Sequence, residues 1–269
     1  MSPDHRPEWQ LPPGVTRGLW DYADNEVVAD DYDNYFAHNK LFDLDEQLIA
    51  RHFRVGTNGN CKLVVDLGCG TGRALLPLIR RGFRGLAIDL SERMLRVVRT
   101  KAEQDGLSVN CLQANLTQLD GVVDCAADYA MCMFSTLGMI HGKNNRQQAL
   151  NHISRILKPD GVFVLHVHNY WYNLYDPGGP WWLLKNFVLS AFDRDMERGD
   201  KYFHYRGVAN MFLHVFTRSE ISRDLRLAGL QISDVTLIDR SRMRPLQLPW
   251  ILGRLRANGW IFVCRKERG

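Results

Sequence analysis

The chain has 269 residues, with 34 Lys and Arg against 30 Asp and Glu, and 45% of its residues are hydrophobic. This is the composition of an ordinary globular protein that can bury a large core as one domain. It excludes a membrane-spanning helix, because no stretch reaches the roughly 18 uninterrupted apolar residues that such a helix needs.

The six cysteines are scattered and none are spaced C-x-x-C, which predicts reduced thiols rather than a disulfide framework or a zinc site. Residues 1–30 are polar and acidic without an apolar core, so they resemble no signal peptide, and we expect a flexible or loosely attached lead-in on a cytoplasmic protein. Residues 31–269 are predicted to form a single domain. Charge is distributed unevenly, since residues 1–50 hold eleven acidic and three basic residues, whereas residues 240–269 hold eight basic residues and one acidic residue.

Strands and helices are predicted to alternate from about residue 35 to residue 168. Apolar residues recur at helical spacing over 35–53, and helices are also expected over 71–81, 92–104 and 145–157. Short apolar runs predict strands over 62–68, 84–90, 107–114, 127–134 and 162–168. A helix over 217–230 and strands over 231–239 and 259–266 follow. This order predicts an α/β fold with a doubly wound, mainly parallel, seven-stranded Rossmann-like sheet.

The regular alternation breaks after the fifth expected strand. Residues 169–210 are rich in aromatic side chains around a Pro-Gly-Gly-Pro turn, and 201–216 has strand character. We therefore expect an aromatic-rich insertion over 169–210 that serves as a lid or as part of a substrate pocket. The long segment between the last two strands is also a candidate functional loop.

The stretch Asp66-Leu67-Gly68-Cys69-Gly70-Thr71-Gly72 follows the first expected strand. Glycines at this position let the backbone approach a ligand at the carboxyl end of the sheet. The pattern is not the dinucleotide G-x-G-x-x-G, since its sixth position is Arg73, and it lacks the G-K-[ST] of a P-loop.

This D-x-G-x-G-x-G pattern resembles motif I of the class I S-adenosylmethionine-dependent methyltransferases. Asp89 matches the acid that holds both ribose hydroxyls in that family, and the K-P-x-G turn before the fifth strand also agrees. Asn115 stands where an Asp or Glu usually receives the adenine amino group. The resemblance implies S-adenosyl-L-methionine as cofactor and S-adenosyl-L-homocysteine as product. It implies cofactor contacts from Tyr35, Asp66, Gly68, Gly70, Gly72, Arg73, Asp89, Leu90, Met94, Asn115, Leu116 and Phe134.

Methyl transfer from a sulfonium needs alignment and exclusion of water more than a generated electrophile. Candidate residues to orient or deprotonate the acceptor are His168 and Tyr170, at the end of the fifth strand, where His166 is expected to share a face with His168. Tyr32 and Tyr35 are candidates for a lid over the methyl donor. Candidate substrate contacts are His141, Asn169, Trp171 and Trp181. No metal site is predicted.

Three functions remain open from the sequence. The first is a methyltransferase acting on the nitrogen or oxygen nucleophile of a small-molecule acceptor. The second is a tRNA methyltransferase of the wobble-uridine type, which residues 212–221 and 258–266 faintly resemble and whose phosphates the basic C-terminal segment would meet. The third is a binding module without catalysis. Residues 242–256 also have the basic and apolar character of an interfacial membrane helix, and the oligomeric state is left open.

Overall fold

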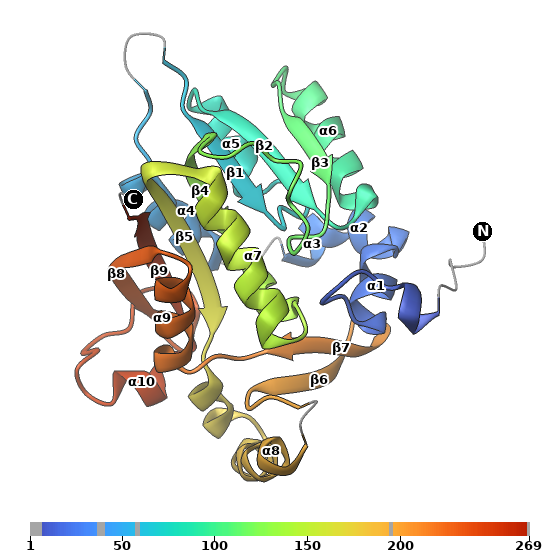
Figure 1. Cartoon of the computed structure of the whole chain (residues 1–269), viewed down its shortest axis with the longest axis vertical. Coiled ribbons are helices and arrows are strands. Elements are labelled where there is room, and N and C mark those ends of the chain that lie inside the picture. The colour runs from blue at the N-terminus through green and yellow to red at the C-terminus, as the bar shows by residue number, and fades with distance from the viewer. Residues whose placement is uncertain (1–6, 37–40, 57–59, 194–195, 268–269) are drawn as a thin grey trace.

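The structure is a computed structural model that describes residues 7–36, 41–56, 60–193 and 196–267. Its centre is a seven-stranded sheet with the order β3-β2-β1-β4-β5-β9-β8 (Figure 1). Strand β9 is antiparallel to β5 and β8, whereas the pairs β1–β2, β2–β3, β1–β4 and β4–β5 are parallel. This confirms the predicted sheet. Its strands are β1 Leu63–Leu67, β2 Arg84–Asp89, β3 Asn110–Gln113, β4 Ala127–Cys132, β5 Leu157–His168, β8 Leu230–Ile238 and β9 Gly259–Lys266.

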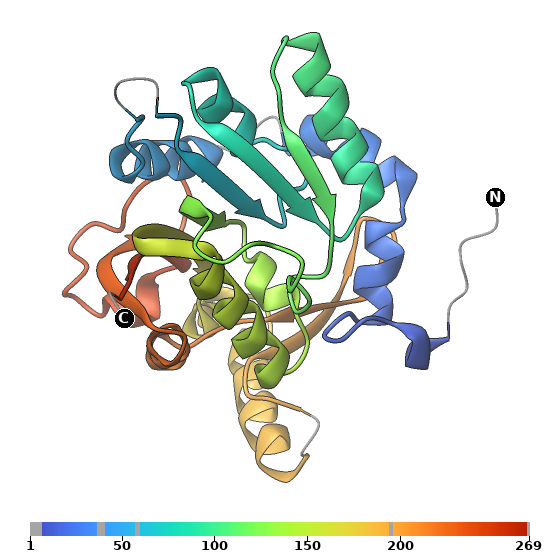
Figure 2. The same cartoon turned by 45° about the horizontal axis from the view of Figure 1, so that its top comes forward.

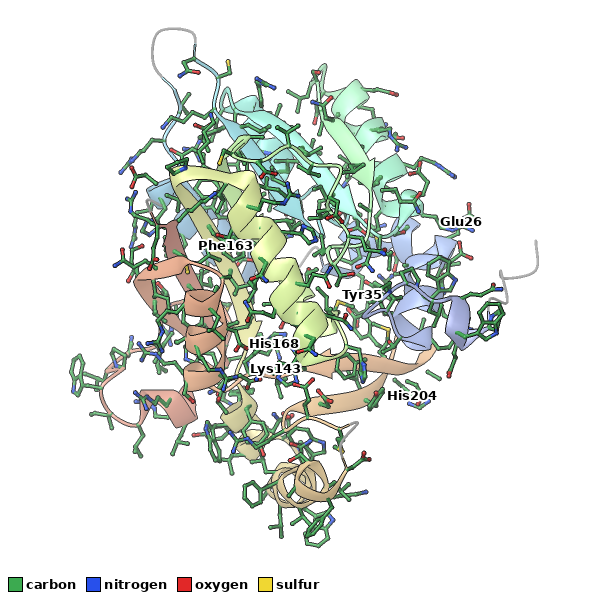
Figure 3. The ribbon with its side chains drawn as sticks, in the orientation of Figure 1. Glu26, Tyr35, Lys143, Phe163, His168 and His204 are labelled. Atoms are coloured by element: carbon green, nitrogen blue, oxygen red, sulfur yellow. The ribbon has the colours of Figure 1, made fainter. Side chains whose placement is uncertain are left out.

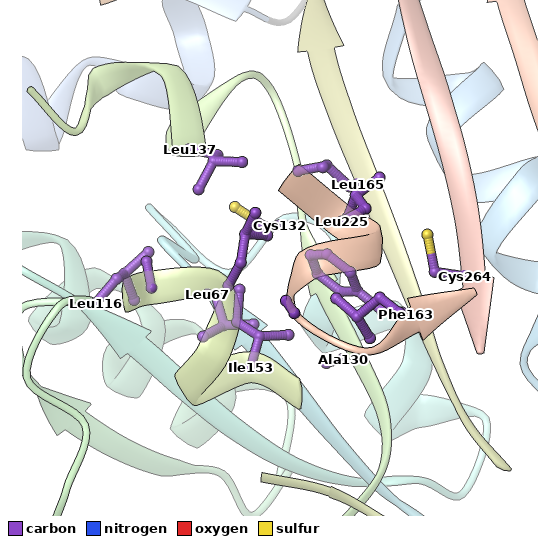
Figure 4. Packing of buried hydrophobic residues seen from close by; sticks show 14 of the residues in the cluster. Leu67, Leu116, Ala130, Cys132, Leu137, Ile153, Phe163, Leu165, Leu225 and Cys264 are labelled. Atoms are coloured by element: carbon purple, nitrogen blue, oxygen red, sulfur yellow. The ribbon is translucent and has the colours of Figure 1, made fainter. Parts of the chain in front are cut away.

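Helices cover both faces of the sheet because alternate strand residues point to opposite sides. On one face, α4 (Leu41–His52), α5 (Leu75–Arg80) and α6 (Glu92–Gln104) pack against a cluster that includes Val64. On the other face, α7 (Lys143–Ile156) and α9 (Arg218–Leu227) pack against Val65 and its neighbours. Figure 4 shows this second cluster, where Ile153 and Leu225 meet side chains of β1, β4 and β5.

Residues 7–30 differ from the loosely attached lead-in that we expected. They form η1 (Glu8–Gln10), α1 (Arg17–Ala23) and α2 (Glu26–Asp30), followed by α3 (Tyr32–Phe36). Gly18 packs closely on a two-stranded sheet formed by residues 200–214. A Cβ added at Gly18 would lie 2.4 Å from the carbonyl oxygen of Asn210 in this sheet. The Arg206 guanidinium donates to the carbonyl of Val28 at 3.2 Å and to the Asp31 carboxylate at 2.9 Å. The segment is therefore held by tertiary contacts, and residues 1–6 lie outside the described residues.

The aromatic insertion after β5 forms three parts. A 3₁₀ helix, η3 (Tyr170–Tyr175), leads into α8 (Gly179–Phe192), and a hairpin of β6 (Asp200–Tyr205) and β7 (Val208–His214) follows. Figure 2 shows α1 beside the hairpin and α8 projecting from the body of the molecule. Between β8 and β9 lies the short helix α10 (Gly253–Arg256), and η2 (Thr136–Met139) follows β4.

All six cysteines are free thiols, in agreement with the prediction of reduced cysteines. None of the helices within the described ranges is both long enough and apolar enough to cross a membrane.

Candidate functional site

The turn after β1 is built on glycine. Gly68, Gly70 and Gly72 have φ values of 73°, 52° and 76°, a region that other residues enter at an energetic cost. The amides of Gly68 and Cys69 both donate to the carbonyl of Ile88, at 2.8 and 3.0 Å, so the turn is fixed to the end of β2. An added Cβ at Gly70 would meet nothing within 4 Å. The turn therefore presents bare backbone to an open space.

Asp89 at the end of β2 connects this turn to the start of α6. Its carboxylate accepts hydrogen bonds from the amides of Gly70 at 2.8 Å and Ser91 at 2.9 Å. Burial raises the pKa of Asp89, while the hydrogen bonds from Ser91, Gly70 and Leu90 oppose the rise by favouring the charged form. Since a carboxylate oxygen accepts more than one hydrogen bond, Asp89 can also receive hydroxyl donors from a ligand.

Asp66 and Asp45 are buried carboxyl groups on either side of Arg73. Burial raises the pKa of each to about 7, and the nearby Arg73 guanidinium limits the rise. Asp45 lies 3.6 Å from the guanidinium, and within the described part of the chain Oδ2 of Asp66 has no hydrogen-bond partner. Both carboxyl groups therefore titrate near neutral pH, and Asp66 has acceptor capacity left for a ligand.

A cavity of about 520 Å³ opens at the carboxyl ends of β1, β2, β4 and β5. Its other walls are formed by the N-terminal helices and by the β6–β7 hairpin. Figure 3 shows His168 at the end of β5 and Tyr35 at the side of the N-terminal helices. The expected site residues that line it are Tyr35, Asp66, Gly68, Gly70, Arg73, Asp89, Leu90, Met94, Asn115, Leu116, Phe134, His168 and Asn169.

Five expected site residues lie outside this lining. Gly72 packs behind the turn, where an added Cβ would lie 3.1 Å from Val98. Tyr170 is buried in the insertion and donates its hydroxyl to the carbonyl of Leu183 at 3.4 Å. The ring of His141 packs at 4.8 Å, edge to face, on Phe212.

The two tryptophans expected at the substrate turn outward instead. Trp171 is 38% exposed and Trp181 is 70% exposed. These two tryptophans therefore belong to the outer face of the insertion, and its aromatic contribution to the cavity wall comes from Tyr172, Phe203 and Tyr205.

Two of the lining amides are already engaged within the protein. The Asn115 side chain donates to the carbonyl of Pro13 at 2.8 Å and accepts from the amide of Thr117 at 3.2 Å. The Asn169 side chain donates to the carbonyls of Arg254 and Ala257, both at 2.8 Å. Both amides hold neighbouring segments in place, which limits what they can offer to a ligand.

His168 is a neutral imidazole in this environment. Burial, and then the positive charges of Arg242 and Lys201, lower its pKa to about 3. As expected, it shares a face of β5 with His166, and the centres of the two imidazole rings are 5.4 Å apart. The ring of Phe134 lies edge to face with His168, with the ring centres 6.5 Å apart. A neutral ring at the cavity wall can accept a hydrogen bond at one nitrogen and donate one at the other.

Several cavity residues were missed by the sequence analysis. From the hairpin come Lys201, Phe203 and Tyr205, from α1 Tyr22, and from the long loop before β9 Arg242. The alternation of residues 201, 203 and 205 along β6 was the available signal, because every second side chain of a strand points to the same face. The sequence alone did not show how β6 pairs with β7, and without that pairing it could not be predicted that this face of β6 lines the cavity.

Comparisons with known proteins agree with this geometry. Residues 64–161 match the family model described as "Methyltransferase domain". The ubiquinone biosynthesis O-methyltransferase of Rickettsia conorii is 29% identical over 122 residues, which are 45% of this chain and 40% of that protein. The chain spans about half the length, or less, of the first curated relatives it matches.

Solved structures share the fold over most of the chain. A SAM-dependent methyltransferase of Methanosarcina mazei has a TM-score of 0.65 at 19% identity, covering 82% of this chain and 98% of that one. The 1,6-didemethyltoxoflavin-N1-methyltransferase of Burkholderia thailandensis, with bound 1,6-didemethyltoxoflavin and S-adenosylhomocysteine, has a TM-score of 0.59 at 18% identity. It covers 90% of this chain and 85% of that one.

Proposed function

Because the chain carries a class I S-adenosylmethionine-dependent methyltransferase domain, we propose that it methylates a nitrogen or oxygen atom of a small-molecule acceptor in the cavity beside β1. S-Adenosylmethionine is the cofactor of this domain, and when bound it supplies a methyl group that direct displacement moves to the acceptor, leaving S-adenosylhomocysteine. The observation that carries the proposal is the glycine turn, which is open at Gly70 and hydrogen-bonded to Asp89, at the edge of the cavity of about 520 Å³.

The residues at the β1 and β2 ends fit the cofactor. Asp89 would hold the ribose hydroxyls, because its carboxylate lies beside the uncovered backbone of Gly70, whose amide donates a hydrogen bond to it. Leu90 and Met94 would form an apolar wall for the adenine. The orphaned oxygen of Asp66 provides negative charge for the cationic end of the cofactor.

Other cofactor contacts belong to the same proposal. Tyr35 and Arg73 line the cavity from the side of the N-terminal helices, and Leu116 and Phe134 extend its apolar wall. Asn115 lines the cavity too, but the carbonyl of Pro13 already takes its amide hydrogen. Its contact with the adenine would use the remaining acceptor capacity of its oxygen.

At the acceptor end, His168 is the residue that we expect to orient the nucleophile. With a pKa of about 3 it stays neutral at physiological pH, so it can accept a hydrogen bond from an N–H or O–H of the acceptor. Such a weak base favours orientation over deprotonation. Phe203 and Tyr205 would close the cavity on the acceptor and exclude water.

The walls of the cavity favour a small acceptor. The α1 helix and the β6–β7 hairpin pack on each other and both line the cavity, so the chain itself supplies walls for a small molecule. The solved methyltransferase with bound 1,6-didemethyltoxoflavin and S-adenosylhomocysteine has the same fold. A salt series of binding assays with total tRNA distinguishes the alternative, since RNA binding weakens steeply as salt rises.

Isothermal titration calorimetry with S-adenosylhomocysteine tests the cofactor site directly. We expect the wild-type chain to bind, and Asp89→Ala to bind at least roughly tenfold more weakly because two ligand hydroxyls lose a charged acceptor. A matched control is Asp120→Ala, an exposed acid outside the cavity, which should bind as wild type. If neither S-adenosylmethionine nor its product binds the folded wild-type chain, the proposal fails.

Screening labelled S-adenosylmethionine against pools of metabolites and of RNA then identifies the acceptor. Turnover on a small molecule that requires the folded chain supports the proposal, whereas turnover on RNA alone overturns the choice of acceptor class.

A further inference from the structure

The helix α8 exposes an unusual amount of apolar surface. Lys185 is the single charged residue in its sequence GPWWLLKNFVLSAF. Trp181, Phe187 and Phe192 are 70%, 57% and 85% exposed, and Leu184 is 53% exposed. Soluble surfaces rarely gather large apolar side chains in this way without a partner.

The segment 243–252, between β8 and β9, is exposed in the same manner. Trp250 is 77% exposed and Leu252 is 66% exposed. About half of each of three further apolar side chains is exposed, namely those of Met243, Leu248 and Ile251. The sequence analysis noted the basic and apolar character of this segment, and the proposed methyl transfer makes no use of these five side chains.

The η3 helix lies between α8 and α10, the short helix that follows the exposed segment 243–252. It packs on both α8 and α10, and its own Trp171, Leu174 and Tyr175 are between 38% and 43% exposed. The Arg240 guanidinium lies 5.8 Å from the ring centre of Tyr175. In Figure 1, α8 and α10 both lie in the lower part of the view. We call the exposed apolar side chains of η3, α8 and 243–252 the apolar end.

Positive charge lies at one side of the apolar end. The segment 239–256 carries five arginines against the single acid Asp239, and α8 adds Lys185. Arg244 pairs with Asp239 at 3.0 Å and Arg256 donates to loop carbonyls, which leaves Arg240, Arg242 and Arg254 without a carboxylate partner among the described residues. The surface is thus apolar at its centre and cationic at its side.

We propose that the apolar end docks on the surface of an anionic lipid bilayer. Tryptophan and phenylalanine side chains that project from a helix and a loop can enter the boundary between headgroups and acyl chains, where aromatic rings are favoured. The arginines beside them would meet lipid phosphates, and the charge complementarity selects a bilayer over an uncharged partner.

Docking would also place the cavity near the bilayer. Tyr172 and Asn173 of η3 and Arg242 of the loop line the cavity from the same two segments that carry the exposed side chains. If the proposed function holds, an acceptor dissolved at the membrane surface would reach the site from there. Binding to lipid is nevertheless measured without cofactor or acceptor, so the two proposals fail separately.

Vesicle sedimentation with the full chain tests the docking. We expect binding to vesicles of phosphatidylcholine with phosphatidylglycerol, and much weaker binding to phosphatidylcholine alone or at high salt. The double variant Phe192→Glu, Trp250→Glu should bind at least roughly tenfold more weakly, and so should Arg240→Gln, Arg254→Gln on anionic vesicles. The control Leu227→Glu changes a side chain that is 66% exposed on α9, outside the apolar end, and should bind as wild type.

Each remaining outcome overturns the proposal. The proposal is overturned if the wild-type chain does not bind anionic vesicles. It is also overturned if Leu227→Glu loses as much vesicle binding as the double variant Phe192→Glu, Trp250→Glu. Circular dichroism verifies that each variant is folded. If size-exclusion chromatography with light scattering shows a wild-type dimer that Phe192→Glu, Trp250→Glu dissociates, while vesicles bind neither form, the apolar end is an interface between two copies of the chain.

Discussion

At the scale of single residues, Gly70 offers a selective test of the cofactor site. Its φ of 52° is unfavourable for alanine, and its added methyl would stand in open space beside Asp89. We expect Gly70→Ala to destabilise the fold by about 1 kcal/mol through backbone strain, and to weaken S-adenosylhomocysteine binding at least roughly tenfold because the methyl occupies the ligand's place.

Gly106→Ala is the matched control for this substitution. Gly106 also has a positive φ, 66°, and an added Cβ there meets nothing within 4 Å, but it lies beyond the end of α6 and outside the cavity. Thermal unfolding should show similar losses of stability in both variants, while calorimetry should show weaker binding in Gly70→Ala alone. Equal binding by the two variants would remove Gly70 from the site.

Asp66 gives the site a dependence on pH. Burial raises the pKa of its carboxyl to about 7, and a bound sulfonium would stabilise the charged form. Below pH 7 the cofactor must therefore displace a proton, so its affinity should rise roughly tenfold between pH 6 and pH 8. Calorimetry over pH 5.5 to 8.5 measures this.

The variants Asp66→Asn and Asp45→Asn separate the two carboxyl groups. Asp45 has a similarly raised pKa of about 7 but does not line the cavity. The dependence should vanish in Asp66→Asn and persist in Asp45→Asn. Persistence in both variants would show that another group carries the pH dependence.

At the scale of elements, the attachment of α1 to the hairpin depends on Gly18. An added Cβ would lie 2.4 Å from the Asn210 carbonyl oxygen, so Gly18→Ala must push α1 away from β7. Because Leu19 and Tyr22 of α1 line the cavity, we expect faster amide exchange over 17–30 together with weaker cofactor binding.

Gly121→Ala provides the comparison for this element. An added Cβ there meets nothing within 4 Å and the residue does not line the cavity, so exchange and binding should remain those of the wild type. If Gly18→Ala speeds exchange in α1 without a loss of cofactor affinity, the helix covers the cavity without contributing to binding.

The elements also show what the sequence could predict. The inner strands were predictable because both of their faces are buried and their runs are largely apolar, as in β1 and in residues 162–167 of β5. Strand β5 nevertheless begins at Leu157 and includes residues 158–161, which were expected to form a turn before it. The expected helix over 71–81 begins only at Leu75, because the turn continues through Gly72 with its positive φ. The N-terminal helices were not predictable, since helices of five to seven residues have little periodicity and depend on tertiary contacts.

The same contrast applies to the site. Its cofactor half lies at the ends of consecutive strands, so a short motif such as Asp66 to Gly72 was sufficient to locate it. The half that we propose for the acceptor combines α1, the hairpin and Arg242, which line the same cavity although they are distant in the sequence. Trp181 was expected there because aromatic content alone does not say which face of a helix will be buried.

At the scale of the whole molecule, the uneven charge distribution has two different consequences. The acidic N-terminal segment is used for attachment, since Asp24 and Glu26 meet Arg93 at 3.4 and 3.3 Å, and Asp31 meets Arg206 at 2.9 Å. The basic segment 239–256 retains exposed arginines beside apolar side chains. The first set of charges is satisfied within the fold, whereas the second is available to an anionic surface.

The buried titratable groups together predict how stability varies with pH. Burial lowers the pKa of His214, but hydrogen bonds with Asp200 at 2.7 Å and Glu220 at 2.8 Å outweigh it and raise the pKa above 6.5. The stabilisation that protonated His214 gives to the folded state is fully present below pH 6.5 and is lost as the pH rises through the pKa of His214 in the folded chain. Asp45 and Asp66 act in the same direction, because between about pH 4 and pH 7 the folded state keeps protons that the unfolded chain releases.

Acid removes a different contribution. The pKa values of Asp200 and Glu220 are lowered, since His214 outweighs the effect of burial, so their stabilisation is present above about pH 4 and is lost on acidification.

His168, with its pKa lowered to about 3, adds stability as the pH rises to about 6.5, so below that pH it opposes the loss from Asp45 and Asp66. Thermal unfolding of the ligand-free chain should therefore give a Tm that falls from about pH 6.5 to pH 8. His214→Gln should flatten this decline, and Asp66→Asn should reduce it between pH 6.5 and pH 7. A wild-type Tm that rises steadily from pH 6.5 to 8 would contradict the raised pKa values of His214, Asp45 and Asp66, because each of them favours the protonated folded state.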